Sequence, residues 1–246
     1  MTLATLQQMK RDGRKIVAVV VYDYQMAQVV DRAGVDLVSV GDSVGMNMWG
    51  QESETDVTLE QMLLACRAVR RGVTRALVSC DVPDGPVQEG PDAAVRAARA
   101  LIDDGGADLV KLEADADVVR AIVGAGVAVW AQLGASSRLK AAPTTELVAL
   151  ATQLEAAGAA MLDFRHSGPD AGPAVVSAVS IPVLGGLGGG PWLDGRVRAI
   201  GNAVGSVASA LDDNVERYAN VARITLDAIT TYAADVRGAR QIKGGA

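Results

Sequence analysis

Three acidic residues stand at equivalent points of three successive repeats, each where an apolar segment of strand length ends. They are Asp42, Asp81 and Glu113. In a parallel α/β barrel, chemistry gathers at the carboxyl ends of the strands, and neighbouring strands lie only about 4.8 Å apart, so the three side chains can converge. A ligand set of carboxylates without histidine or cysteine suits a hard cation. The pattern therefore predicts an Mg²⁺ site held by these three residues.

Lys111 precedes Glu113 by two positions, so we expect both side chains to face the barrel interior. A lysine in that place can neutralise a substrate carboxylate or an enolate oxygen. The alternative is that each acid only caps the following helix, because acids at strand ends often do so. Three acids together with a lysine on the same face favour the metal site.

The elements that must position these residues follow from an alternation of short apolar runs with longer amphipathic stretches. The apolar runs are typical of buried parallel strands. The expected strands are Ile16–Val21, Val35–Val40, Ala76–Cys80, Asp108–Leu112, Val127–Ala131, Ala159–Phe164 and Ile181–Leu184, with a weaker eighth at Arg196–Ile200.

Helical spacing fills the intervals between these strands. The expected helices are Tyr24–Ala33, Leu59–Arg71, Asp92–Asp104, Ala116–Val123, Glu146–Ala157, Ala174–Ala178 and a long last helix at 213–236, capped by Asp212 or Asp213. Gly34 and Gly158 each stand between a helix and a strand, where a left-handed glycine ends the helix. No G-x-G-x-x-G follows the first strand, so we predict a single (β/α)₈ TIM barrel over residues 1–246 rather than an open sheet.

The composition excludes several classes of protein. Half of the 246 residues are hydrophobic, which is too many for a disordered chain. A net charge of −6 and only 3% aromatic residues argue against a nucleic-acid partner. Neither a signal peptide nor a membrane span is readable, and Cys66 and Cys80 have no metal-like spacing, so we expect a cytoplasmic protein without membrane contact. The one histidine, His166, excludes a polyhistidine metal site.

Several motifs resemble those of the ketopantoate hydroxymethyltransferase (3-methyl-2-oxobutanoate hydroxymethyltransferase) family, which belongs to the phosphoenolpyruvate mutase/isocitrate lyase superfamily. Val40-Gly41-Asp42-Ser43-Val44-Gly45-Met46 is similar to the family's V-G-D-S-x-G-M, and Val110-Lys111-Leu112-Glu113 to its V-K-L-E-G. Val21-Tyr22-Asp23-Tyr24 resembles the family's exit from the first strand, and weaker similarities extend over nearly the whole chain.

The resemblance implies an Mg²⁺-dependent aldol reaction on a small 2-oxo acid, through a metal-stabilised enolate that receives a one-carbon unit from 5,10-methylenetetrahydrofolate. By the same resemblance, Asp42 and Asp81 are metal-side ligands, and Glu113 is a ligand directly or through water. The residues that we expect to contact the substrate are Tyr22, Asp42, Ser43, Asp81, Lys111 and Gln132. We also expect a homo-oligomer.

The chain departs from the family where catalysis is expected. Arg165 stands where the family has its proton-accepting glutamate, and Gln132 stands where it has a histidine. Arginine cannot act as a base, because its guanidinium stays protonated, so Asp163 and His166 become candidate catalytic residues beside Lys111 and Arg165. Arg165 can bind a second anionic group of the substrate or only form a salt bridge with Asp163. The alternative for His166 is an ordinary surface residue.

Three functions therefore remain open. The first is the family reaction, hydroxymethyl transfer to a 2-oxo acid. The second is a divergent aldolase, retro-aldol lyase or decarboxylase acting on another 2-oxo acid, including a dicarboxylic one that Arg165 would recognise. The third is a catalytically inactive binding homologue. Retention of Asp42, Asp81, Lys111 and Glu113 favours an enzyme, because an inactive site has no physical need for clustered charges.

Overall fold

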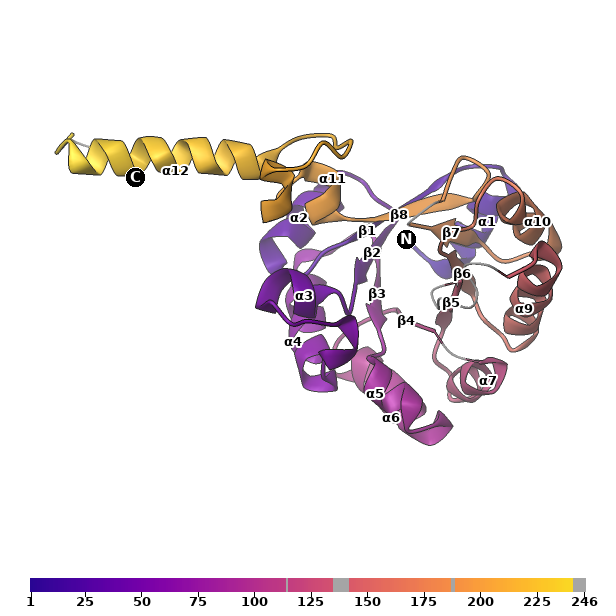
Figure 1. Cartoon of the computed structure of the whole chain (residues 1–246). Coiled ribbons are helices and arrows are strands. Elements are labelled where there is room, and N and C mark those ends of the chain that lie inside the picture. Colours follow the sequence, from indigo (N-terminus) through magenta and orange to yellow (C-terminus); the bar gives the residue numbers. More distant parts are fainter. Residues whose placement is uncertain (114, 135–141, 187–188, 241–246) are drawn as a thin grey trace. The chain divides into compact units, whose positions relative to one another are not determined.

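Eight parallel strands close a barrel in chain order, with helices around the outside of the ring (Figure 1). The computed structural model describes residues 1–113, 115–134, 142–186 and 189–240. The strands are β1 Ile16–Val20, β2 Leu37–Val40, β3 Leu77–Asp81, β4 Leu109–Leu112, β5 Val129–Leu133, β6 Met161–Phe164, β7 Val183–Gly185 and β8 Gly195–Ala199. The predicted (β/α)₈ TIM barrel is confirmed, including the weak eighth strand.

The helices of the barrel follow the amphipathic stretches of the sequence. They are α1 Leu3–Arg11, α2 Tyr24–Arg32, α3 Val44–Trp49, the 3₁₀ turn η1 Glu54–Asp56, α4 Leu59–Gly72, α5 Asp84–Gln88, α6 Pro91–Asp103, α7 Ala116–Gly124, α9 Thr144–Ala156 and α10 Ala171–Ala178. Gly34 and Gly158 both adopt a positive φ, 84° and 99°, as expected of a glycine that ends a helix.

The hydrophobic core fills the end of the barrel opposite to the predicted site. The first residues of several strands, Leu37, Leu77, Leu109 and Met161 among them, pack there against Leu6 of α1. Each fully buried leucine or isoleucine contributes about 1.5–3 kcal/mol to stability. Hydrophobic packing therefore occupies the amino-terminal end of the barrel, and polar side chains lie at the carboxyl ends of the strands.

The chain divides into two compact units, residues 1–198 and residues 199–246. The helices of the second unit are α11 Ile200–Val204, the 3₁₀ turn η2 Ala208–Leu211 and α12 Val221–Arg237. The single-domain organisation of residues 1–246 stays a prediction. No helix within the described ranges is long and apolar enough to cross a membrane.

The predicted start of the last helix, at Asp213, is wrong. The helix α12 begins at Val221, and the side chain of Asn220 caps it by accepting a hydrogen bond from the Arg223 amide at 2.9 Å. Asp213 is instead paired with Arg217, whose Nη2 lies 2.6 Å from Asp213 Oδ2. Asp213 also accepts a hydrogen bond from the Val215 amide at 3.0 Å, a local bond of the kind found in turns, so the sequence signal at Asp213 marks a turn and not the start of a helix.

Candidate active site

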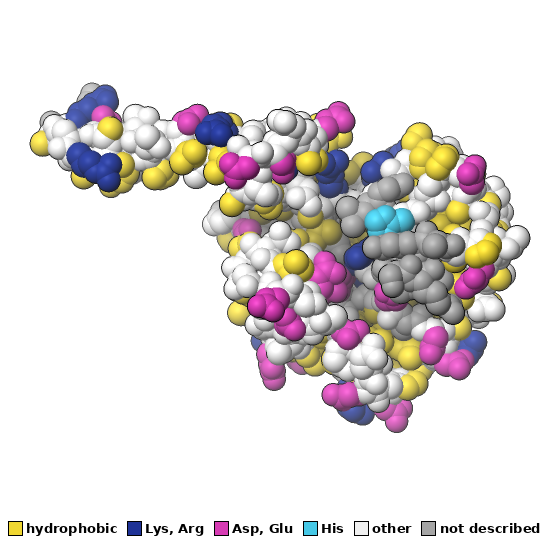
Figure 2. Space-filling model, viewed as in Figure 1, with side chains coloured by type: hydrophobic (Ala, Val, Ile, Leu, Met, Phe, Trp, Pro, Cys, Tyr) yellow, Lys and Arg dark blue, Asp and Glu magenta, His cyan; other side chains and the backbone are white. Residues whose placement is uncertain are grey.

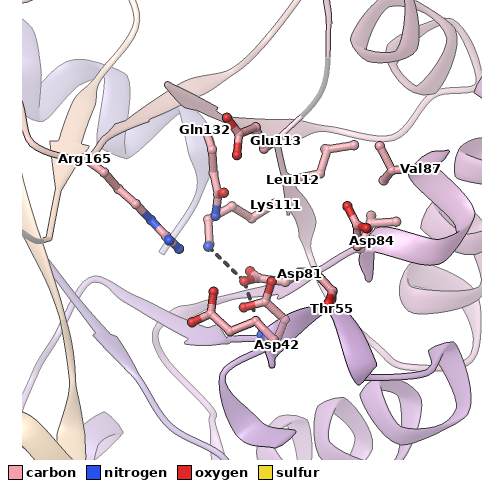
Figure 3. A pocket seen from close by; sticks show the side chains of 12 residues that line it. Asp42, Thr55, Asp81, Asp84, Val87, Lys111, Leu112, Glu113, Gln132 and Arg165 are labelled. Atoms are coloured by element: carbon pink, nitrogen blue, oxygen red, sulfur yellow. Dashed lines mark hydrogen bonds and ion pairs between the residues drawn. The ribbon is translucent and has the colours of Figure 1, made fainter. Parts of the chain in front are cut away.

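A pocket of about 180 Å³ opens at the carboxyl ends of the strands. Figure 3 shows Lys111 and Arg165 pointing across it toward Asp42 and Asp81. The residues that line it are Asp42, Glu54, Thr55, Asp81, Val82, Asp84, Val87, Lys111, Leu112, Glu113, Gln132 and Arg165. All three predicted metal ligands and Lys111 are thus in one pocket.

A buried ion pair forms the base of the pocket. The register of β3 and β4 places Asp81 beside Lys111, and Lys111 Nζ donates to Asp81 Oδ2 at 2.9 Å. Only 2% of Asp81 and 3% of Lys111 are exposed. Lys111 Nζ also lies 3.9 Å from Asp163 Oδ2 and 5.7 Å from the centre of the Trp130 ring. Burial by itself lowers the pKa of Lys111, but the carboxylates of Asp81 and Asp163 outweigh it and raise that pKa, so the amine stays charged.

Asp42 lies against this pair. Its backbone amide donates to Asp81 Oδ2 at 3.3 Å. Gly41 permits the close approach, because a Cβ there would come within 3.0 Å of Val20 Cγ1 and of Ser43 Oγ. Burial and the charge of Asp81 raise the pKa of the Asp42 carboxyl to about 6. Burial also raises the pKa of Asp81, although Lys111 opposes the shift.

Two of the three predicted metal ligands have the properties that a divalent cation requires. In the described part of the chain, Asp81 Oδ1 is buried without a hydrogen-bond partner, and a cation would satisfy it. A cation would equally relieve the mutual repulsion of Asp42 and Asp81, and Mg²⁺ is commonly held by one or two carboxylates with water completing the shell. The donor set therefore fits Mg²⁺.

The Glu113 side chain lies apart from those of Asp42 and Asp81. It is exposed, and in Figure 3 it lies on the side of the pocket opposite to Asp42. Among the described residues no group of three or more acids, cysteines or histidines is close enough to hold a metal ion together. Metal binding by Asp42, Asp81 and Glu113 stays a prediction, and contact through a water suits Glu113 best.

Arg165 forms the ion pair with Asp163 that we expected as one alternative, and it also lines the pocket. Its Nε lies 3.6 Å from Asp163 Oδ2, and Asp163 is 2% exposed behind it. With the Gln132 amide oriented so that its oxygen faces the two cations, that oxygen accepts from Arg165 Nη2 at 3.2 Å and from Lys111 Nζ at 2.5 Å. The guanidinium nevertheless lines the pocket and keeps 24% of its side chain exposed. Asp163 and Gln132 fix the guanidinium, and its exposed part can contact a molecule bound in the pocket.

Tyr22 and Ser43 lie beside the pocket rather than in its wall. Tyr22 OH and Ser43 Oγ are 3.0 Å apart, and Asn47 Nδ2 donates to Tyr22 OH at 3.3 Å. Burial raises the pKa of Tyr22, so it is a neutral hydroxyl. Neither residue is among those that line the pocket. Their contact with a substrate stays a prediction.

His166 is not part of the pocket. It is exposed, it has a positive φ of 56°, and Figure 2 shows the one histidine of the chain in cyan at the surface. The placement favours the surface alternative over a catalytic role. Asp163 is also absent from the pocket wall, and its contacts are those of a residue that orients Lys111 and Arg165.

Sequence reasoning missed Glu54, Thr55 and Asp84, which all line the pocket. Glu54 and Thr55 belong to η1, between α3 and α4, and Asp84 is the first residue of α5, so none of the three stands at a strand end. The Ser-x-x-Asp spacing of Ser53 and Asp56 indicates only the capping box that these two residues form, and gives no sign that Glu54 lines a pocket.

Comparison with known proteins bears out the resemblance. The family described as ketopantoate hydroxymethyltransferase matches residues 1–240. A 3-methyl-2-oxobutanoate hydroxymethyltransferase of Cyanothece sp. is 35% identical over 252 residues, which cover 96% of this chain and 96% of the relative. The protein of the same name from Salinibacter ruber is 36% identical over 251 residues, covering 96% and 94%.

Solved structures share the fold at much lower identity. A phosphonopyruvate hydrolase in complex with oxalate and Mg²⁺ has a TM-score of 0.64 at 15% identity, over 98% of this chain and 89% of that one. A 2,3-dimethylmalate lyase of the PEP mutase/isocitrate lyase superfamily has a TM-score of 0.62 at 19% identity, over 79% of each chain. The family match and the curated relatives together show that this chain is an enzyme of the ketopantoate hydroxymethyltransferase family.

Proposed function

We propose that the protein catalyses an Mg²⁺-dependent hydroxymethyl transfer that forms a C–C bond at the carbon next to the carbonyl of a 2-oxo acid. The observation that carries the proposal is the buried Lys111–Asp81 pair beside Asp42, at the base of a pocket at the strand ends. The curated relatives are named for 3-methyl-2-oxobutanoate, which makes this acid the first acceptor to test. We propose 5,10-methylenetetrahydrofolate as the one-carbon donor.

Asp42 and Asp81 would hold the cation, with Glu113 contributing directly or through water. The chemistry that Mg²⁺ supplies when bound there is Lewis-acid polarisation of the 2-oxo carbonyl. Lys111 contributes a fixed positive charge to the same reaction. Because Asp81 and the Gln132 oxygen anchor its ammonium group, Lys111 can stabilise negative charge that develops on a substrate oxygen without first reorganising.

A second candidate is aldol-type chemistry on a dicarboxylic 2-oxo acid. The specific observation in its favour is Arg165, whose guanidinium lines the pocket while Asp163 holds it from behind. A guanidinium presented in this way can bind a carboxylate through two parallel hydrogen bonds. This candidate keeps the same metal ligands and the same lysine, and differs only in the group that faces Arg165.

Deuterium exchange distinguishes the candidates. The protein is incubated with Mg²⁺ and 3-methyl-2-oxobutanoate in D₂O, and loss of the C3 proton signal is followed by NMR. We expect exchange that is abolished by Asp81→Asn and retained by Asp84→Asn, since Asp84 is exposed and makes no contact with Lys111 in the described residues. Exchange of dicarboxylic 2-oxo acids alone would select the second candidate. No exchange with any 2-oxo acid would overturn both.

Formation of a hydroxymethylated product on addition of 5,10-methylenetetrahydrofolate tests the one-carbon donor. Product formation with free formaldehyde alone would refute folate use. Homo-oligomeric assembly and a cytoplasmic location accompany this proposal as predictions.

A further inference from the structure

Glu54 is a carboxylate in the pocket wall that the proposed mechanism has not used. It is the first residue of η1, in the connection between α3 and α4. It lines the same pocket as Asp42, Lys111 and Arg165. No family motif quoted above includes it.

The backbone around Glu54 is held in place by its neighbours. Ser53 Oγ accepts from the Thr55 amide at 3.2 Å, and Asp56 Oδ2 accepts from the Ser53 amide at 3.0 Å. Gln51 Nε2 in turn donates to the Asp56 carbonyl at 3.4 Å. A short turn fixed at both ends presents Glu54 in one place, which a residue that reacts with a bound substrate needs.

Two other acids near the centre of the site, Asp81 and Asp163, already have cationic partners. Asp81 is bound to Lys111, and Asp163 lies within 3.9 Å of Lys111 and 3.6 Å of Arg165. Within the described residues, the Glu54 carboxylate makes neither a hydrogen bond nor an ion pair of that kind, and it is only half-buried. It is therefore available to accept a proton, whereas protonation of Asp81 or Asp163 would break an existing ion pair.

The pKa of Glu54 and the pKa values of groups around it are linked through their charges. Burial and other charged groups have the larger effects on the pKa of Arg165 and the pKa of Tyr22, and the charge of Glu54 further raises both. Burial and the charge of Asp42 raise the pKa of Glu54 itself, although Arg165 and Lys111 oppose the shift. Glu54 thus lines the same pocket as Asp42 and Arg165, and its raised pKa makes it a better base than an exposed glutamate.

We propose that Glu54 is the catalytic proton acceptor that removes the proton from the carbon next to the 2-oxo carbonyl. The inference rests on the proposed function. The C–H bond breaks, its proton passes to a carboxylate oxygen of Glu54, and its electron pair becomes the C=C bond of the enolate while the carbonyl electron pair moves to oxygen. In D₂O, Glu54 exchanges its proton with solvent and returns a deuteron to the same carbon, so no other reactant is required.

The rival groups are less well placed for this step. His166 is exposed and outside the pocket wall, and Asp163 is buried against two cations. Arg165, which carries a permanent positive charge, has the complementary task of neutralising the anion formed when the proton leaves.

The test compares Glu54→Gln with Glu52→Gln. Glu52 is a matched control, because it is exposed two residues away and does not line the pocket. Exchange of the substrate proton is measured in D₂O with Mg²⁺, using whichever 2-oxo acid the unmodified protein exchanges. Binding of Mg²⁺, and of that acid in the presence of Mg²⁺, is measured by titration calorimetry, and urea unfolding verifies that both variants fold.

We expect Glu54→Gln to slow exchange by at least about 100-fold while both dissociation constants stay close to those of the unmodified protein. Glu52→Gln should change neither quantity, and Glu54→Asp should restore part of the exchange because it returns a carboxylate. Exchange in Glu54→Gln within a few-fold of normal overturns the proposal but leaves the proposed function standing. Loss of acid binding together with exchange also overturns it, since Glu54 would then be a binding residue. An unmodified protein without exchange overturns both proposals.

Discussion

Replacing Asp42 by asparagine should stabilise the metal-free protein while removing a proposed metal ligand. The Asp42 carboxyl is partly buried next to Asp81, and the two together raise its pKa to about 6. At neutral pH the folded protein must therefore keep a charge in a place that disfavours it. Asparagine has nearly the shape of the neutral acid and carries no charge, so the variant escapes this cost.

The magnitude follows from the pKa difference between the folded and unfolded states. An unfolded aspartate titrates near 3.9, and the folded group near 6. Two pKa units correspond to about 3 kcal/mol. Below about pH 4 both states hold the proton and no cost arises. As the pH rises toward 6 the unfolded chain releases its proton first, so the stability of the unmodified protein falls by about 3 kcal/mol and then stays constant.

The assay is urea unfolding with a chelator at several pH values. The Asp42→Asn variant should match the unmodified protein near pH 4 and exceed its free energy of unfolding by about 3 kcal/mol near pH 7. Saturating Mg²⁺ should stabilise the unmodified protein and not the variant. Asp84→Asn, at an exposed position of the same pocket, should show neither effect. A variant that is less stable at pH 7 without metal, or a difference independent of pH, would refute the reasoning.

Two further substitutions test the packing beneath the site. Lys111→Met removes the cation that pairs with buried Asp81. We therefore expect the free energy of unfolding at neutral pH to fall by about 3–5 kcal/mol, as measured by guanidinium unfolding. An unchanged unfolding midpoint would contradict a structural role for the pair. A Cβ on Gly195 would lie 2.2 Å from the Ile16 carbonyl oxygen, where β8 meets β1 to close the barrel. The substitution Gly195→Ala should therefore lower the free energy of unfolding by about 1–3 kcal/mol. Gly124→Ala, with nothing within 4 Å of the added carbon, should be neutral or slightly stabilising by thermal unfolding, and equal losses for the two glycines would count against the explanation.

The barrel could be predicted because its strands carry their own signal. The strand β2, Leu37–Val40, is buried throughout, and burial on both faces selects the continuous apolar segment that the sequence shows. The strand prediction Val35–Val40 therefore differs from β2 only at its start. The start of α12 could not be read in the same way, because Asp213 has an arginine partner four residues on and Asn220 caps the helix instead.

The residues of the candidate site also differ in how well the sequence predicts them. Asp42, Asp81 and Lys111 were predictable because the register of parallel strands brings strand ends to one edge. Glu54 was not predictable, because the conformation of the segment that contains it depends on contacts such as the hydrogen bond between Gln51 and Asp56. His166 also follows a strand closely, but it has a left-handed backbone and is exposed, so a catalytic role for it stays a prediction.

The charges of the pocket imply an order of binding. Five carboxylates and two cationic groups are found among the described residues that line it. Lys111 and Arg165 are each already paired with a buried acid, so the empty pocket repels a 2-oxo acid. A divalent cation at Asp42 and Asp81 reduces that repulsion and gives the acid a group to bind. The cation should therefore enter first, and the affinity for Mg²⁺ and the affinity for the acid must rise together, because coupling between two ligands is reciprocal. If the proposed function holds, the acidic excess of the pocket makes binding of the 2-oxo acid depend on prior binding of the cation.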